Sequence, residues 1–246
     1  MKNIFFAIIF FTTMSVFAQQ RFYPQAFIEL YSSEGCENCP YADEFTKQIM
    51  SIADSAKQPV YVIDFHVDIW DRSGWKDPYS NSVFTTRQIK CAEKNNQPAI
   101  FTPMVFVNGE GAIPGGARKE IGNLINKALS IPRTHRLVTN ANMVEGKTTL
   151  SVDYQIIGKI DSIDIHFALI KRLIKQNVTA GDNKGKILEH HNVVMVFESD
   201  ELKSNNGHHD LNLPTSYIDL HEFALVTFLQ KKGGGIVYSV DELLFK

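Results

Sequence analysis

The chain has 246 residues, a formal net charge of −2 and an isoelectric point near 6.4. This near-neutral balance offers no strongly basic surface for nucleic acid or for an anionic membrane, so we expect neither as a partner. The hydrophobic fraction of 44% is ordinary for a globular protein, and the length accommodates one large domain or two of common size.

The first 18 residues have the composition of a secretory signal. Lys2 precedes an apolar run over residues 4–11, and Ala18 supplies a small residue at a cleavage point. A membrane anchor is the alternative, but the apolar run is short for a bilayer span, which needs about 20 residues. We therefore expect a signal peptide over residues 1–18, export to the periplasm or the extracellular space, and no stable membrane insertion after cleavage.

The segment after this leader alternates between strand and helix patterns. Residues 26–32 are apolar and β-prone, residues 39–55 have the three- and four-residue spacing of an amphipathic helix, and residues 60–67 form a second strand. A strand, a helix and a strand with short links make a βαβ unit, so the two strands should be parallel neighbours. The pattern then continues with a helix at 82–95, a strand at 102–109, a short edge segment at 112–114 and a helix at 117–129.

The pattern changes after Ile131-Pro132. From Leu137 onward, apolar and polar residues alternate with period two in several segments, and turn-rich stretches separate them. Such spacing is typical of an antiparallel sandwich. The predicted fold class is therefore an α/β domain with the order β-α-β-α-β-β-α over residues 19–132, followed by an all-β, sandwich-like domain over residues 133–246.

Two of the three cysteines form a C-x-x-C pair where the first strand meets the first helix. A helix N-terminus stabilises a thiolate, so we expect Cys36 to attack a disulfide and Cys39, one turn further in, to resolve the intermediate. Glu34 and Glu37 oppose this activation, because nearby carboxylates disfavour negative charge on sulfur. A structural disulfide or two unreactive thiols are the alternatives. Cys91 remains without a partner.

Metal binding is a weaker interpretation of the same residues. A structural zinc site usually has four protein ligands, and only Cys91 remains as a further thiolate. Cu(I) held by Cys36, Cys39 and His66 is chemically permissible, because soft thiolates favour that ion. We interpret the later histidines, including His190-His191, as surface or capping residues, since neighbours in a strand point to opposite faces. The leading interpretation includes no metal and no cofactor.

Polar and aromatic residues follow the second strand. His66 and Asp68 share a face, and His66 is suited to shuttling a proton or favouring a thiolate. The alternative is that both residues brace the loop that carries Trp70 and Trp75. The two tryptophans either line a groove for a peptide or apolar ligand or pack as ordinary aromatic side chains.

The order of elements and the position of the C-x-x-C pair resemble the thioredoxin-like superfamily. In that superfamily the dithiol opens the first core helix, and a cis-proline at the start of a later strand faces it. The resemblance therefore implies that the bond between Thr102 and Pro103 is cis and that this loop lies against Cys36. It also implies a thioredoxin-like fold for the N-terminal domain.

A closer resemblance is to an uncharacterised family of bacterial secreted proteins, in which a thioredoxin-like domain precedes a β domain. It implies a fold more than an activity. Six N-terminal segments carry it, and a later Gly, Leu, His and Asn-Val-Val signature agrees with them. These segments are SEGCENCP at 33–40, HVDIWD at 66–71, GWKDP at 74–78, Arg87-Gln88, Thr102-Pro103, Val107-Asn108-Gly109, and Gly185, Leu188, His190 or His191 and Asn192-Val193-Val194.

The leading functional prediction is an exported thiol–disulfide oxidoreductase or redox carrier, whose partners are protein or small-molecule thiols and disulfides. A non-catalytic binding module with a groove beside the Pro103 loop is one alternative, and a Cu(I) metallochaperone is another. The predicted site contains Cys36, Cys39 and Pro103, with His66, Asp68, Thr102, Trp70 and Trp75 in support.

Overall fold

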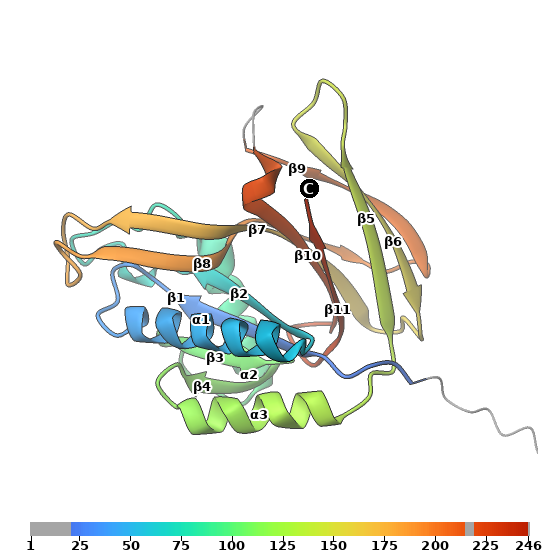
Figure 1. Ribbon diagram of the computed structural model, residues 1–246, viewed down its shortest axis with the longest axis horizontal. Coiled ribbons are helices and arrows are strands. Elements are labelled where there is room, and N and C mark those ends of the chain that lie inside the picture. The colour runs from blue at the N-terminus through green and yellow to red at the C-terminus, as the bar shows by residue number, and fades with distance from the viewer. Residues whose placement is uncertain (1–20, 215–218, 246) are drawn as a thin grey trace, which may run out of the picture.

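The computed structural model describes residues 21–214 and 219–245, so the predicted signal peptide lies outside the described residues. None of the helices in this described part is long and apolar enough to cross a membrane. The elements (Figure 1) are β1 (Ala26–Ser32), α1 (Cys39–Ala56), β2 (Val60–His66), the 3-10 turn η1 (Asp68–Trp70), α2 (Ser82–Lys94), β3 (Met104–Val107), β4 (Glu110–Pro114), α3 (Arg118–Ser130), β5 (Arg136–Met143), β6 (Thr149–Ile157), β7 (Ile163–Asn177), β8 (Ile187–Glu201), β9 (Asn206–Asn212), the 3-10 turn η2 (Leu220–Glu222), β10 (Phe223–Lys231) and β11 (Val237–Leu244).

Eight strands form one mixed sheet in the order β11-β10-β7-β8-β2-β1-β3-β4. Strands β1 and β2 are parallel, as the βαβ pattern predicted, and Ser32 lies opposite His66 at their carboxyl ends. Strand β8 joins β2 in parallel where Asp64 faces Val193. The long strands β7 and β8 are an antiparallel pair, and β5, β6 and β9 form a separate three-stranded sheet.

The predicted fold class is wrong. We expected a thioredoxin-like α/β domain followed by an all-β sandwich, but strands from both parts of the chain share the eight-stranded sheet. The described residues are mostly β, with three α-helices. The alternating pattern identified strands in the second part, but it does not say which strand edge they join. Where the chain divides into folding units stays a prediction.

One apolar core contains side chains from both the N-terminal and the C-terminal part of the chain. Phe27 of β1 and Phe228 of β10 have ring centroids 4.7 Å apart. At the same end of the molecule the β3–β4 turn touches the β10–β11 turn, and a Cβ on Gly109 would come within 2.2 Å of the Gly235 carbonyl oxygen. Gly109 also has a φ of 75°, so two constraints require glycine there. The same core includes Phe65, Phe84, Cys91, Met104, Ala168, Ile170 and Val226.

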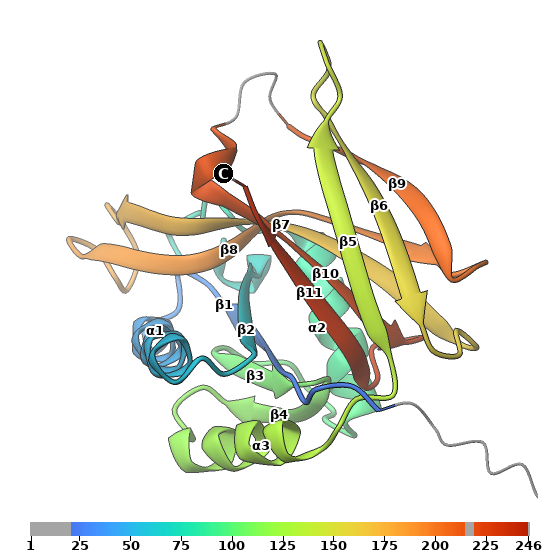
Figure 2. The same ribbon diagram turned by 45° about the vertical axis from the view of Figure 1, so that its right-hand side comes forward.

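The two faces of the large sheet have different covers (Figure 2). Helix α2 packs on one face through Phe84 and Ala92. Helices α1 and α3 cover β1, β2 and β3 on the other face, through residues such as Ala42 and Ile121. The three-stranded sheet packs on alternate residues of β7 and β10, as when Leu150 shares a cluster with residues of those strands. Alternation along each strand therefore buries both faces of the sheet.

A buried ion pair also joins the two parts. Arg87 of α2 donates to one carboxylate oxygen of Glu29 through Nε at 2.9 Å and Nη2 at 2.6 Å, and Nη2 also donates to Gln230 of β10 at 2.8 Å. Burial alone lowers the pKa of Arg87, but Glu29 outweighs it and raises the pKa above the usual value. The guanidinium carbon lies 4.9 Å from the ring centroid of Phe197.

Replacing Arg87 tests this connection. Arg87→Met leaves the Glu29 carboxylate buried without its partner, so we expect a loss of about 3–5 kcal/mol in the free energy of unfolding, measured with urea. Lys127→Met removes one side of the exposed Lys127–Glu110 pair, and as a control it should cost about 1 kcal/mol or less. Equal losses in the two variants would contradict a structural role for the buried pair.

Candidate functional site

The two paired cysteines lie where β1 ends and α1 begins. They form a disulfide with a Cα–Cα distance of 5.4 Å. The N–H of Cys36 donates to the Ser33 carbonyl oxygen at 3.1 Å, which shapes the turn before the helix. The N-cap residue Asn38 makes no side-chain capping bond, and a proline occupies the first turn of α1. Cys36 and Cys39 are only 2% and 1% exposed, so the disulfide is buried although the residues between them are exposed.

The loop before β3 lies beside this turn. The Thr102–Pro103 peptide bond is cis, and Pro103 is buried. The indole Nε1 of Trp70 donates to Thr102 Oγ1 at 2.6 Å. A Cβ on Gly35 would come within 2.8 Å of Trp70 Cβ. Trp70 therefore packs directly on the cysteine turn and ties it to the Thr102–Pro103 loop.

The second tryptophan is also used inside the protein. Trp75 is half-buried, and its Nε1 donates to Glu34 Oε2 at 2.7 Å. The backbone N–H of Glu34 in turn donates to Asp77 Oδ2 at 2.8 Å. Trp75 thus holds the cysteine turn through a hydrogen bond, whereas Trp70 holds it by packing on Gly35.

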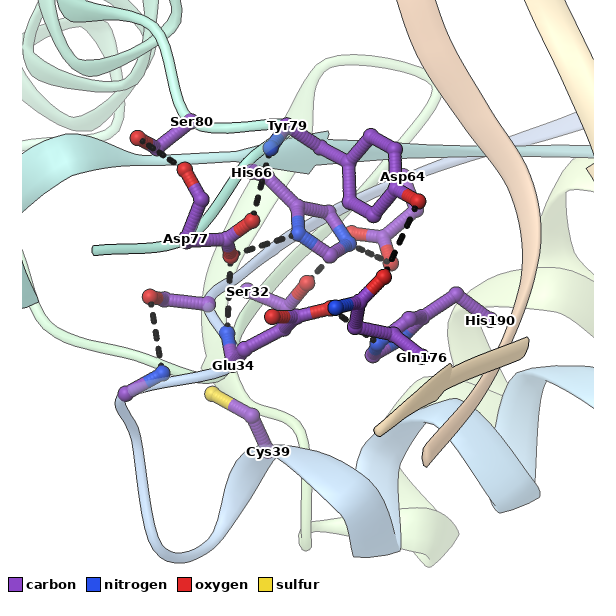
Figure 3. A network of polar contacts seen from close by, with 12 residues as sticks. Ser32, Glu34, Cys39, Asp64, His66, Asp77, Tyr79, Ser80, Gln176 and His190 are labelled. Atoms are coloured by element: carbon purple, nitrogen blue, oxygen red, sulfur yellow. Dashed lines mark hydrogen bonds and ion pairs between the residues drawn. The ribbon is translucent and has the colours of Figure 1, made fainter. Parts of the chain in front are cut away.

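A cluster of buried charged side chains lies behind the disulfide, and Figure 3 shows Cys39 next to it. We call it the acid–imidazole cluster. It gathers side chains from the cysteine turn, α1, β2, the loop before α2, and β8. None of its members is more than 6% exposed. They are Glu34, Asp43, Asp64, His66, Asp77 and His190.

Each histidine of the cluster lies between two carboxylates. His66 Nδ1 donates to Asp77 Oδ2 at 2.7 Å, and His66 Nε2 lies 3.3 Å from Asp64 Oδ2. His190 Nδ1 donates to Asp43 at 2.9 Å, and its Nε2 lies 3.4 Å from Glu34 Oε1. The two imidazole rings meet edge to face, with centroids 4.7 Å apart.

These contacts shift the protonation of the cluster. Burial by itself lowers the pKa of His66, but Asp77 and Asp64 outweigh it and hold the pKa well above 6.5. Burial likewise lowers the pKa of His190, and the hydrogen bond to Asp43 together with the nearby Glu34 carboxylate raises it to about 9. The pKa of Asp43 is raised, because burial outweighs its bond to His190. The cluster therefore retains positive imidazoles among its carboxylates at neutral pH in the absence of another cation.

The β7–β8 turn contacts the cysteine turn through Asn183. This side chain is fully buried, and its amide donates to the carbonyl oxygens of Glu34 at 2.8 Å and Cys36 at 3.0 Å. Asn183 therefore satisfies two carbonyl groups of the disulfide turn. The second part of the chain helps to build the site.

The structure brings some of the predicted site residues together and separates others. Cys36, Cys39, Trp70 and Thr102 surround one turn, with Pro103 behind Ala42 in the first turns of α1; a Cβ on Gly115 would come within 3 Å of both these residues. Asp68 instead accepts from Thr85 Oγ1 of α2 at 2.5 Å. His66 turns both ring nitrogens to carboxylates.

Sequence reasoning missed much of the buried cluster. Interpreting His190 as a surface or capping residue was wrong, because it is 1% exposed. Its strand was placed in a separate domain, so nothing in the pattern connected it to β2. The available signal was its position in the Gly, Leu, His and Asn-Val-Val signature. Asp43 and Asn183 were not identified, and Asp77 entered only as part of the GWKDP motif, because acidic and amide residues in helices and loops are usually solvated.

The unpaired cysteine lies away from this chemistry. Cys91 lies on the core-facing side of α2, and its sulfur accepts from the Tyr31 hydroxyl at 3.9 Å. Burial raises the pKa of its thiol to about 11, so it stays protonated at neutral pH. Cys91 is therefore an unreactive thiol that fills part of the core.

Comparisons with known proteins give a family and a fold. The profile of the family described as "Protein of unknown function (DUF1223)" matches residues 27–230. A crystal structure of protein AGR_C_4864 from Agrobacterium tumefaciens is similar with a TM-score of 0.67 and 19% identity, over 92% of this chain and 96% of that one. HBP35 of Porphyromonas gingivalis is similar with a TM-score of 0.63 and 15% identity, over 90% of this chain and 75% of that one. No curated protein matched the sequence.

Removing the Asn183 amide tests the link between the β7–β8 turn and the disulfide turn. Asn183→Ala leaves two buried carbonyl groups without their donor, so we expect a loss of about 2 kcal/mol in the free energy of unfolding. We also expect faster reduction of the disulfide by dithiothreitol, because the turn opens more easily. Asn38→Ala, which removes an exposed side chain from the same turn, is the control and should change neither quantity appreciably. An Asn183 variant that matches this control would refute the link.

Proposed function

The chain belongs to the DUF1223 family, and we propose that it acts as an exported thiol–disulfide oxidoreductase or redox carrier. The disulfide between Cys36 and Cys39, closed across the start of α1, is the observation that carries this proposal. The apolar run and small residues of positions 4–18 support export. Export would place the pair where disulfides persist.

The surroundings of the pair favour exchange chemistry. The first backbone N–H groups of a helix have no partner within the helix, and they stabilise a thiolate at its N-terminus. Trp70 and the cis Thr102–Pro103 loop flank the cysteine turn. The resemblance to the thioredoxin-like superfamily, drawn from the dithiol and this loop, supports the chemistry, although the predicted fold class was wrong.

The proposed cycle moves two electrons. The Cys36 thiolate attacks one sulfur of a substrate disulfide, which forms a mixed disulfide and releases the other substrate sulfur as a thiolate. The Cys39 thiolate then attacks Cys36 Sγ, which closes the protein disulfide and releases the second substrate thiolate. The substrate is reduced, the protein pair is oxidised, and a thiol donor must restore the dithiol.

Burial adds a step to this cycle. Because both cysteines are nearly inaccessible, the cysteine turn must move before Cys36 meets a protein substrate. The two residues between the cysteines, Glu37 and Asn38, are exposed and offer the surface that a substrate meets first. Of the alternatives, the binding module gains little support, because both indole N–H groups are bonded inside the protein. The Cu(I) site gains little as well, because His66 faces carboxylates.

Single cysteine variants test the cycle. In a disulfide reductase assay we expect Cys36→Ser to fall to background, because the attacking sulfur is gone. Cys39→Ser should accumulate a mixed disulfide with the substrate, because nothing resolves it. Cys91→Ser is the matched control and should keep wild-type activity. Equal activity in the wild type and in Cys36→Ser would contradict the proposed cycle.

The exposed residues between the cysteines should tune the reduction potential. Carboxylates near Cys36 destabilise the reduced pair, so we expect a potential nearer about −270 mV than about −120 mV in equilibrium with glutathione. Glu37→Gln should raise the potential by about 10 mV and Asn38→Asp should lower it by about as much, because both charges are exposed and partly screened. Shifts of the same sign in the two variants would contradict this electrostatic account.

A further inference from the structure

Several atoms of the acid–imidazole cluster are buried and point at one another without being hydrogen-bonded. Glu34 Oε1, His66 Nε2 and His190 Nε2 are fully enclosed, and none has a hydrogen-bond partner within residues 21–214 and 219–245. Buried polar atoms normally have a partner, because losing water without replacement is costly. Three such atoms from three different elements in one place indicate that a group is bound between them.

The spacing of these atoms fits a metal ion. One ligand atom each from Asp64, His66 and His190 lies within 4.8 Å of the other two. His66 Nε2 is 3.3 Å from Asp64 Oδ2, and His190 Nε2 is 3.4 Å from Glu34 Oε1. Tetrahedral ligands at about 2.0–2.2 Å from an ion lie about 3.3–3.6 Å from one another. These two contacts are too long for good hydrogen bonds and have the spacing of neighbouring ligands on one ion. The remaining ligand atoms, which lie within 4.8 Å of one another in the Asp64, His66 and His190 group, must draw closer together to bind it.

The hydrogen bonds that hold these side chains in place are also those expected around a metal centre. Metal-ligating histidines usually donate their other ring N–H to a carboxylate or carbonyl, which fixes the ring. His66 does so to Asp77, and His190 does so to Asp43. The carboxylates are held as well. Asp64 Oδ1 accepts from Ser32 Oγ at 2.7 Å, and Glu34 Oε2 accepts from Trp75 Nε1 at 2.7 Å.

We propose that Asp64, His66 and His190 bind one divalent transition-metal ion, that Glu34, which lies beside His190, moves in as the fourth ligand, and that Zn²⁺ fits the site best. Two imidazoles and two carboxylates suit Zn²⁺, whereas Ca²⁺ takes six to eight oxygen ligands and Mg²⁺ keeps several waters. The ion replaces the protons on the two Nε2 atoms, because only neutral imidazole is a ligand.

The position of the site gives the ion a structural role. Its ligands come from the cysteine turn, from β2 and from β8, so a bound ion holds the disulfide turn against the point where the two parts of the sheet join. The three ligands and Glu34 are all buried, which is typical of closed structural sites rather than catalytic ones with an open position. The cysteines are not ligands, so binding of the ion does not require the redox-active pair.

Binding of the metal alone is the first test. The full-length oxidised protein is stripped with a chelator and titrated with Zn²⁺ against a chromophoric competitor. We expect one ion per chain and a higher melting temperature with Zn²⁺. Co²⁺ should give the intense visible absorption of a four-coordinate site. Wild-type protein that stays folded but binds no ion stoichiometrically would overturn the proposal without any variant.

Variants then locate the site. His66→Gln and His190→Gln should each weaken Zn²⁺ binding by about 100-fold or more, because each removes a ligand. Asp43→Asn, which removes only the support of His190, should weaken it by about 10–100-fold. His208→Gln is the matched control, because His208 is an exposed histidine with two carboxylate neighbours on the three-stranded sheet. Loss of binding in the control, or its retention in both cluster variants, would contradict the assignment.

A variant that lacks both paired cysteines distinguishes the metal site from the proposed redox site. The Cys36→Ser, Cys39→Ser double variant should still bind one Zn²⁺ with wild-type affinity while losing any reductase activity. Binding that disappears with the cysteines would mean that thiolates are the ligands, which would overturn the site proposed here. If the histidine variants fail to fold, the double variant and the Co²⁺ spectrum still decide between the two ligand sets.

Discussion

The pairing of β8 with β2 is the contact on which the rest of the structure depends. It converts strands from the two parts of the chain into one eight-stranded sheet, and it is made at a single register position, where Asp64 faces Val193. Asn192 supports it from a left-handed backbone conformation, donating its side-chain amide to the Val62 carbonyl oxygen at 2.9 Å. With this edge of β2 covered, the β7–β8 turn lies over the cysteine turn, where Asn183 contacts it.

The same pairing creates an unusual interior. It places His190 beside His66 and encloses both imidazoles with four carboxylates. Buried charges are expensive unless they are paired and hydrogen-bonded, so a hydrophobic interior would be the simpler solution for stability alone. Retaining this many ionisable groups beneath a disulfide is therefore a functional signal. A bound cation would neutralise much of the negative charge and use the nitrogen atoms that now lack partners.

The disulfide turn and the acid–imidazole cluster are built partly from the same residues. Glu34 belongs to the turn that carries Cys36, and its carboxylate points into the cluster and is held by Trp75. Asp77 holds both the Glu34 backbone and the His66 ring. A change in the cluster would therefore be transmitted to the cysteine turn through two or three side chains. Access to the buried sulfurs and the state of the cluster are physically coupled for this reason.

The sequence by itself determined the local elements and the dithiol. Hydrophobic spacing predicted α1 nearly to its ends, Cys36 and Cys39 at the head of that helix, and the parallel β1–β2 pair, because these features depend on residues close along the chain. Only the tertiary structure decided that β8 joins β2, and thus that His190, Asp43 and Asp77 meet His66 and Asp64. A period-two pattern says that a segment is a strand with a buried face, but strand edges carry the same backbone groups everywhere. The partner of a strand is therefore settled by long-range packing, and with it the residues that form the site.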